Sequence, residues 1–328
     1  MKKALILLMG IGLFLSCSKD TPVIDEPTTS KEYIVSLGFS GEITQISESP
    51  LRSTFSNDLY GIQVYAMPNQ GSSDYKPYAY GLFDDKALMT IKLLEGYKYK
   101  FVCSMVVDGK NRVVFYSEGY SFPFYSNETT PLNNIFTYSS SKEMTSLSRG
   151  TTQLTVPRSS FTRPNLDRYY GQVEGYVPSE NSSISINMKR VVFGIKVEVE
   201  GVTDGKVKIS LSEAPDLYIE YPATEIQDIF TFQNSRSFTH PSDWTNDNYS
   251  ETLTLSVNWL KADGAEVPIA TQDVVFKRNM LTTIRVKVND ALVDNNLTIT
   301  TESTEMGDGG TIDLEGDGGT KTPVDPNP

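Results

Sequence analysis

The stretch SISINMKRVVFGIKVEVE, residues 183–200, contains two runs in which every second residue is apolar, at 184–188 and at 195–199. Alternation with a period of two is typical of a β-strand that buries one face. The stretch therefore predicts two consecutive strands. The same pattern recurs along most of the chain, so it decides the fold class.

Further alternating runs lie on both sides of this stretch, at residues 33–43, 62–66, 89–93, 97–105, 207–211, 253–259 and 284–288. The pairs Asp108-Gly109, Asp204-Gly205 and Asp263-Gly264 stand within a few residues of such runs, as hairpin turns require. Convincing helical patterns are nearly absent. We therefore expect an all-β protein made of two consecutive β-sandwiches.

The chain divides into five segments by composition and periodicity. We place the junction between the sandwiches near Val202, with an alternative near Arg168, because residues 149–168 have little periodicity and contain two prolines. The last segment is rich in acids and repeats Gly-Asp-Gly-Gly, which predicts a flexible tail. The segments are a signal peptide at 1–16, a lipidated tether at 17–31, an N-terminal sandwich at 32–201, a C-terminal sandwich at 202–301 and an acidic tail at 302–328.

Charge and motif content exclude several functions. The 29 Lys and Arg residues against 41 Asp and Glu residues give a net charge of -12, which argues against nucleic acid as a partner. The one histidine, His240, stands in a polar loop, and phosphate-binding, dinucleotide and nucleophile-elbow motifs are missing. We expect no enzymatic activity, catalytic residue, metal or cofactor. Paired carboxylates for glycoside hydrolysis stay open as an alternative, because the sequence singles out no pair.

The N-terminus carries an export signal. Lys2 and Lys3 precede an apolar run at 4–15, which is too short to span a bilayer. The following residues, Ser16 and Cys17, complete a segment that resembles the lipobox of bacterial lipoproteins, which implies cleavage before Cys17 and its acylation, with palmitate among the expected lipids. The alternative is an ordinary secretion signal with an incidental cysteine. The other cysteine, Cys103, falls at an alternating position and predicts a buried strand residue.

The order of several motifs resembles the fimbrillin-type lipoproteins, the subunits of type V pili in Bacteroidales. Each motif is weak alone, and their sequence along the chain makes the resemblance. They are the lipobox at Cys17, the strand at 33–43 followed by Pro50-Leu51-Arg52-Ser53, the segments GIQVYA at 61–66 and LEGYKY at 94–99, the basic-then-apolar segment MKRVV at 188–192, and FKRN at 276–279 before TIRV at 283–286.

The resemblance implies transthyretin-like sandwiches and a structural function in adhesion. It also implies that an Arg-specific protease removes the lipid and the first strand together, and that a C-terminal segment of a neighbouring subunit takes the vacated place. Arg52 fits the cleavage site by its position after the strand, which carries Ile34, Leu37, Phe39 and Ile43 and would leave with the cut; the alternative is a solvated loop residue. The implied location is the outer membrane surface, and a fimbrium after maturation.

The donor segment is expected between residues 296 and 314, because two short apolar alternations flank a Gly- and Asp-rich connector there. Its anchors would be Leu297, Ile299, Ile312 and Leu314, and residues from 316 onward would be dispensable. The alternative is that the first pair ends the last strand of the subunit and the second pair has no role. The implied partners are other pilus subunits, the membrane through the lipid, and surface ligands on host or bacterial cells.

A second functional class is a surface lipoprotein that binds carbohydrate. The chain contains 18 tyrosines, and Trp244, Tyr78 and Tyr80 are candidates for stacking on sugar rings. Trp259 and many of the tyrosines fall at alternating strand positions, where packing in the core is the more frequent explanation.

Overall fold

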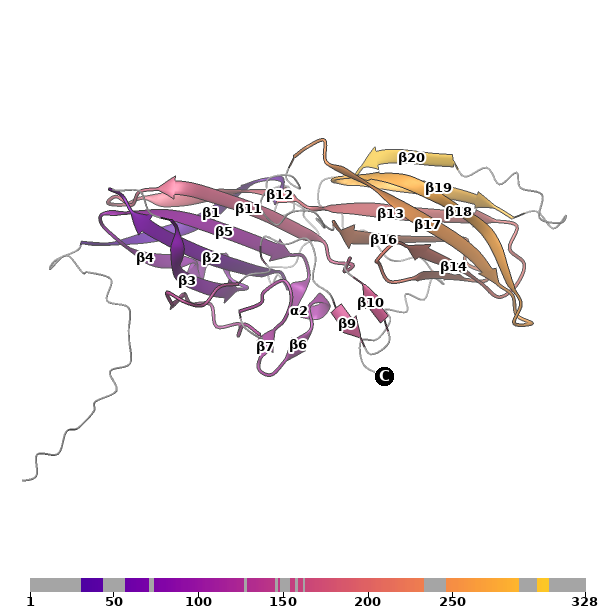
Figure 1. Ribbon diagram of the computed structural model, residues 1–328, viewed down its shortest axis with the longest axis horizontal. Coiled ribbons are helices and arrows are strands. Elements are labelled where there is room, and N and C mark those ends of the chain that lie inside the picture. Colours follow the sequence, from indigo (N-terminus) through magenta and orange to yellow (C-terminus); the bar gives the residue numbers. More distant parts are fainter. Residues whose placement is uncertain are drawn as a thin grey trace, which may run out of the picture.

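The computed structural model describes residues 31–43, 57–70, 74–126, 129–144, 147, 154–156, 159–161, 163–232, 246–288 and 300–306. Within them the protein is all-β, as expected, and the strands form two bodies that lie end to end (Figure 1). The helical elements that lie wholly within this part are one turn each, η1 (Lys86–Leu88) and α2 (Gly109–Arg112), and the two residues that follow β1, Glu42 and Ile43, are also helical.

The N-terminal body is built on an eight-stranded sheet with the order β4-β1-β12-β11-β5-β2-β3-β8. Only two residue pairs join β11 to β12, and the two halves of the sheet on either side of this place share one hydrophobic core, as in a sandwich. A short hairpin, β6 and β7, lies beside it. The strands are β1 (Glu32–Gly41), β2 (Leu59–Pro68), β3 (Lys76–Phe83), β4 (Thr90–Leu94), β5 (Tyr97–Val106), β6 (Phe115–Tyr116), β7 (Gly119–Tyr120), β8 (Thr137–Tyr138), β11 (Arg168–Tyr176) and β12 (Ser183–Arg190).

The core of this sandwich confirms the alternating pattern. Ile62 and Val64 of β2 pack with Ile184 and Ile186 of β12, all fully or almost fully buried. Cys103 of β5 lies in the same core, as predicted from its alternating position. Burying one such aliphatic side chain contributes about 1.5–3 kcal/mol, so this shared interior holds the two halves together.

The C-terminal body is a sandwich of two four-stranded sheets, β16-β13-β19-β20 and β15-β14-β17-β18. Their inner faces share one core, which includes Phe193, Val257 and Phe276. The strands are β13 (Val192–Glu200), β14 (Lys206–Leu211), β15 (Leu217–Glu220), β16 (Glu225–Thr231), β17 (Ser250–Leu260), β18 (Glu266–Lys277), β19 (Met280–Lys287) and β20 (Thr300–Glu305), and the small hairpin of β9 (Leu154–Val156) and β10 (Ser159–Phe161) precedes them.

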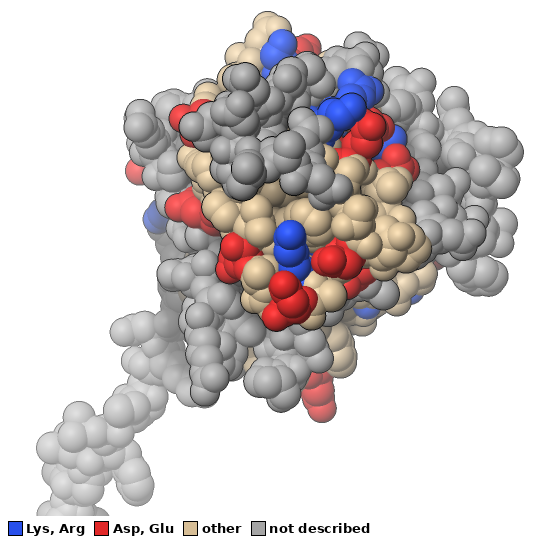
Figure 2. Space-filling model, turned by 90° about the vertical axis from the view of Figure 1, so that its right-hand side faces the viewer, with Lys and Arg blue, Asp and Glu red and all other residues tan. Residues whose placement is uncertain are grey.

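The far end of the C-terminal sandwich carries acidic side chains around isolated basic ones (Figure 2). Glu200 pairs with Lys287 at 3.3 Å and Glu220 with Lys206 at 3.5 Å, and all four side chains are exposed. Such exposed pairs contribute little to stability. Nearby, Trp259 is buried and its indole N–H donates to the carbonyl of Asp204 at 2.7 Å, which agrees with the predicted core position.

The stretch 183–200 is divided between the two sandwiches. β12 pairs with β1 and β11, whereas β13 pairs with β16 and β19. The chain therefore changes sandwich at Val191, between the positions near Arg168 and Val202 that the sequence offers. The passage contains no turn residue, and Val191, Val192 and Phe193 are all buried, so no break in hydrophobicity marks it.

The beginning of the expected tail is a strand. Residues 300–305 pair antiparallel with β19 as β20, from Arg285 opposite Thr300 to Met280 opposite Glu305. Residues 302–305, which the sequence assigned to the flexible tail, are therefore part of the edge of a sheet, and the rest of the expected tail after residue 306 lies outside the described residues. In the described part of the chain, no helix has the length and apolar character needed to cross a membrane.

Candidate functional site: the first strand and its anchor

The first strand, β1, lies inside the N-terminal sheet although it is the first strand of the described chain. It pairs in parallel with β12, from Ser36 opposite Ser183 to Gly41 opposite Met188, and antiparallel with β4 on its other side. Strand pairing of this kind uses the backbone groups on both edges. The first half of β1, to Ser36, pairs with β4 and the second half, from Ser36, pairs with β12, so removal of β1 would leave one row of unpaired backbone groups on each of these strands, staggered along the place of β1.

The inward face of β1 consists of Val35, Leu37 and the half-buried Phe39, whose ring stacks on Tyr60 at a centroid distance of 5.3 Å. Ile43 is buried just beyond the strand. Ile34, another apolar residue of this strand, points outward, and its side chain is 69% exposed. Ile34 and Val35 are adjacent and both apolar, so composition alone does not fix which one faces inward.

Tyrosine hydroxyls close the outer edge of β4. The backbone N–H of Lys92 donates to the hydroxyl of Tyr138 at 3.0 Å, and Tyr78 donates to the carbonyl of Lys92 at 3.0 Å. The hydroxyl of Tyr99 accepts from the N–H of Leu94 at 2.7 Å and donates to its carbonyl at 3.1 Å. Burial raises the pKa of Tyr99 to about 12 and also raises the pKa of Tyr78. These contacts satisfy the edge that would otherwise accept another strand.

The end of β1 is fixed to the C-terminal sandwich by an ion pair. Gly41 adopts a φ of 82°, and a Cβ there would lie 2.1 Å from Oδ1 of Asn187, so only glycine fits. The chain then turns and directs Glu42 to Arg278, which lies in the turn between β18 and β19. Arg278 donates Nη1–H to Oε2 of Glu42 at 2.9 Å and Nη2–H to Oε1 at 3.0 Å.

Arg278 is the centre of this anchor. Its side chain is only 3% exposed, and each of its five N–H groups has an acceptor. The three not given to Glu42 donate to the carbonyl oxygens of Asn246 and Arg190 and to Oδ1 of Asp247. A buried guanidinium is stable only when its donors are satisfied, so Glu42 completes the set.

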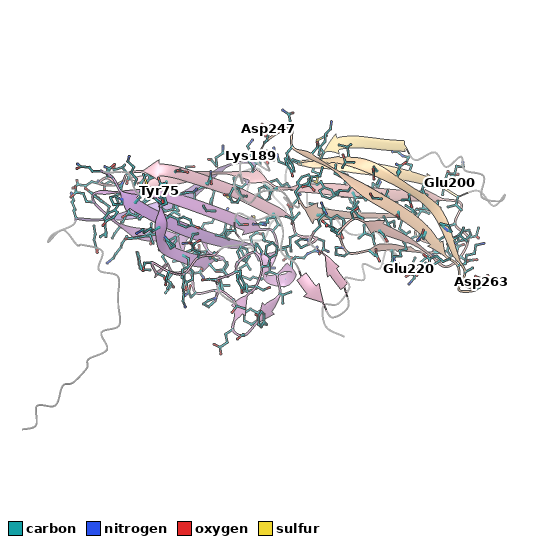
Figure 3. The ribbon with its side chains drawn as sticks, in the orientation of Figure 1. Tyr75, Lys189, Glu200, Glu220, Asp247 and Asp263 are labelled. Carbon is teal, nitrogen blue, oxygen red and sulfur yellow. The ribbon has the colours of Figure 1, made fainter. Side chains whose placement is uncertain are left out.

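A second carboxylate lies on the outer side of the anchor. Asp247 accepts from Lys189 at 2.8 Å as well as from Arg278 at 2.7 Å, and Figure 3 shows Asp247 and Lys189 together above the junction of the sandwiches. The hydrogen bond from Lys189 is the main reason why the pKa of Asp247 is lowered. Glu42 also accepts from the backbone N–H of Arg190 at 2.7 Å. The carboxylate of Glu42, directly after the first strand, thus contacts both sandwiches.

The residues that the sequence singled out for processing and exchange lie outside the described residues. These are Cys17, Arg52, Leu297, Ile299, Ile312 and Leu314, together with His240 and Trp244. Of the candidates for sugar stacking, Tyr78 bonds to the edge of β4 and Tyr80 is partly buried against the core. The described residues contain no group of three or more His, Cys, Asp or Glu side chains that could hold a metal ion. The sequence missed the Glu42–Arg278 pair, because 236 positions separate its members.

Comparisons with known proteins give structural likeness only. No family model and no curated protein matches the chain. Among solved structures, a Bacteroides uniformis protein assigned to cell adhesion is similar at 8% identity, covering 86% of this chain and 100% of that one, with a TM-score of 0.36. The fimbrial anchor protein Mfa2 of Porphyromonas gingivalis is similar at 11% identity over 84% and 98%, with a TM-score of 0.35. A Bacteroides thetaiotaomicron protein assigned to polysaccharide binding is similar at 10% identity over 84% and 98%, with a TM-score of 0.38.

These structures include fimbrial and adhesion proteins, the class that the motif order resembles. Likeness at this level of identity and superposition carries no argument about function. The function proposed below therefore rests on the sequence of this chain and on the geometry of β1.

Proposed function

We propose that this protein is an exported structural subunit of a surface fimbrium, made as a lipoprotein and assembled when a strand from another subunit replaces β1. The observation that carries the proposal is the position of β1. It is the first strand of the described chain, yet it lies between two strands, and it is followed by the segment that contains Arg52. One cut at Arg52 would separate the lipid and β1 from the rest of the subunit.

The interior of the vacated place supports a replacement by another strand. Loss of β1 would uncover the apolar groove that Val35 and Leu37 fill, together with the backbone groups of β4 and β12. Both features favour an extended segment with alternating apolar residues. Tyrosine hydroxyls already bond the backbone groups on the outer edge of β4. An incoming strand would therefore find unpaired backbone groups in the place of β1 and not on that outer edge.

Adhesion and attachment to the outer membrane follow from the N-terminal signal and from the resemblance to pilus subunits. Acylation of Cys17 would hold the precursor at the membrane, since two or more acyl chains give stable attachment. Carbohydrate binding has less support, because the hydroxyl of Tyr78 is committed to the fold.

Controlled cleavage tests this function. We expect the lipid-free chain from residue 18 onward to remain monomeric until an Arg-specific protease cuts at Arg52, and then to form a ladder of oligomers that resists dodecyl sulfate at room temperature. Arg52→Lys should prevent the ladder, and a site for an unrelated protease in place of residues 49–54 should restore it with that protease. Cleaved protein that stays monomeric at high concentration would refute the strand-exchange mechanism.

A further inference from the structure

The contacts that hold β1 are made with residues far along the chain from it. Its backbone pairs with β4 and β12, the N–H of Leu37 donates to the carbonyl of Met89 at 2.9 Å, and Phe39 stacks on Tyr60. These partners all come after residue 57, and the contacts are hydrogen bonds and side-chain packing. A cut at Arg52 would therefore break one peptide bond and leave these contacts of β1 in place.

The two ends of β1 are held with different strength. At its start, Glu32 pairs with Lys92 at 3.5 Å, and both side chains are more than half exposed. Directly after its end, Glu42 accepts two hydrogen bonds from Arg278, whose side chain is 3% exposed, and one from the N–H of Arg190. Exposed pairs contribute little, whereas loss of one partner of a buried pair is costly. The stronger contact is thus at the end of β1 that precedes the proposed cut.

Release of β1 has to break this anchor while Arg278 is buried. Arg278 would keep the carboxylate of Asp247, but the two N–H groups that donate to Glu42 would lose their acceptor. The apolar groove that Val35 and Leu37 fill would become exposed at the same time. Unsatisfied buried donors and exposed apolar surface both raise the free energy of the open subunit. Contacts of this kind act mainly on the rate of dissociation, so β1 should leave slowly.

We infer that the place of β1 is a peptide-binding site whose first ligand is the subunit's own segment 31–43, and that this segment stays bound after the cut. The inference rests on the proposed cleavage at Arg52. Cleavage makes the strand removable without removing it, and the Glu42–Arg278 pair sets the rate at which it leaves. Processing and activation are therefore two separate steps.

This arrangement also determines where a cut subunit is found. The lipid proposed for Cys17 is carried by the same segment as β1. A subunit that retains the segment after cleavage stays attached to the membrane, and its apolar groove stays filled. Loss of the strand would then open the groove and detach the subunit from the membrane in one event.

Capture of the cleaved segment tests whether it stays bound. The chain from residue 18 onward carries an affinity tag at its N-terminus and the unrelated protease site in place of residues 49–54. After complete cleavage, at a protein concentration too low for the ladder to form, the tag should retain the rest of the subunit. The retained amount should then fall slowly as a single exponential.

Two results would contradict this expectation, and they differ in what they overturn. Immediate separation of the two parts, with a ladder at higher concentration, would overturn the inference and leave the proposed function standing. Immediate separation without a ladder at any concentration would overturn both.

Variants at the two ends of β1 test the role of the anchor. Glu42→Ala should speed the loss of the subunit from the tag roughly tenfold to a hundredfold, because the bound segment no longer satisfies Arg278. The matched control, Glu32→Ala, should change the rate by about twofold or less. Circular dichroism before cleavage checks that each variant is folded, and Glu42→Gln with Glu32→Gln gives the same comparison if Glu42→Ala does not fold. Equal rates at the two positions would overturn the role of the Glu42–Arg278 pair.

A synthetic peptide of residues 31–43 tests the place of β1 as a binding site. Its C-terminus is amidated, so that a terminal carboxylate cannot replace that of Glu42. Present in excess during cleavage, the peptide should slow formation of the ladder, and the same peptide with Glu42→Ala should need a concentration roughly tenfold higher or more for an equal delay. The Glu32→Ala peptide should act like the unmodified one. A peptide that leaves the rate of assembly unchanged, or a Glu42→Ala peptide of equal potency, would overturn the inference.

Discussion

Glu42→Ala removes the carboxylate that stands directly after β1 and ties that strand to the junction of the sandwiches. The change leaves two N–H groups of the buried Arg278 and the N–H of Arg190 without their acceptor. Loss of one member of a fully buried ion pair costs about 3–5 kcal/mol, and loss of a surface pair at most about 1 kcal/mol. The side chain of Glu42 is 22% exposed and that of Arg278 3% exposed, and Asp247 remains on Arg278. We therefore expect a loss of about 2–3 kcal/mol in the free energy of unfolding.

The matched control is Glu32→Ala, at the other end of β1. Glu32 makes only a 3.5 Å pair with Lys92, and both side chains are more than half exposed. We expect a loss of about 0.5 kcal/mol or less. Urea denaturation followed by circular dichroism measures the global effect, and hydrogen exchange of the Arg190 amide reports on the anchor itself. If the two variants unfold within about 0.5 kcal/mol of each other and Arg190 stays equally protected, the anchor does not hold β1 and the reasoning fails.

Three further outcomes follow from the same structure. The pKa of Tyr99 rises from 10.0 to about 12 on folding, so its contribution to the free energy of unfolding should be fully present below pH 10 and lost as the pH rises through 12. When the free energy of unfolding is measured against pH, Tyr99→Phe should make this alkaline decrease smaller. Gly41→Ala should destabilise the protein by about 1–3 kcal/mol more than Gly96→Ala, because both glycines have positive φ but only Gly41 would contact Asn187; equal losses of thermal stability would contradict this. The thiol of Cys103 is buried and its pKa is raised, so it should react with a thiol reagent in urea and stay unreactive in the native protein.

Most strands of this protein could be predicted from its sequence, because most of them bury one face and show alternating apolar residues. Val207 and Ile209, for instance, alternate with exposed or half-exposed lysines on β14 and lie in the core as the pattern indicates. Where two adjacent residues of a strand are both apolar, the alternating pattern does not predict which of them faces the core. At Ile34 and Val35 the choice of face depends on pairing with β4 and β12, which a single strand does not encode.

The candidate site was harder to predict than the strands. Arg278 belongs to the segment FKRN, which the sequence singled out only as a family-like motif, and its partner Glu42 was not singled out at all. Nothing local distinguishes Arg278 from a solvated turn residue until the fold brings Glu42, Asp247 and the carbonyl of Arg190 to it.

The passage from β12 to β13 without a turn has a mechanical consequence. One extended backbone runs from the interior of one sandwich into the interior of the other, flanked by β1 and β11 on one side of the junction and by β16 and β19 on the other. A pull along the long axis of the molecule would act parallel to these strands. The hydrogen bonds between them run across the strands, perpendicular in the antiparallel pairs and slanted in the parallel pairs with β1 and β19, so a pull along the strands would load them in shear and they would share the force. A subunit connected in this way resists extension at the very point where two domains are usually easiest to separate.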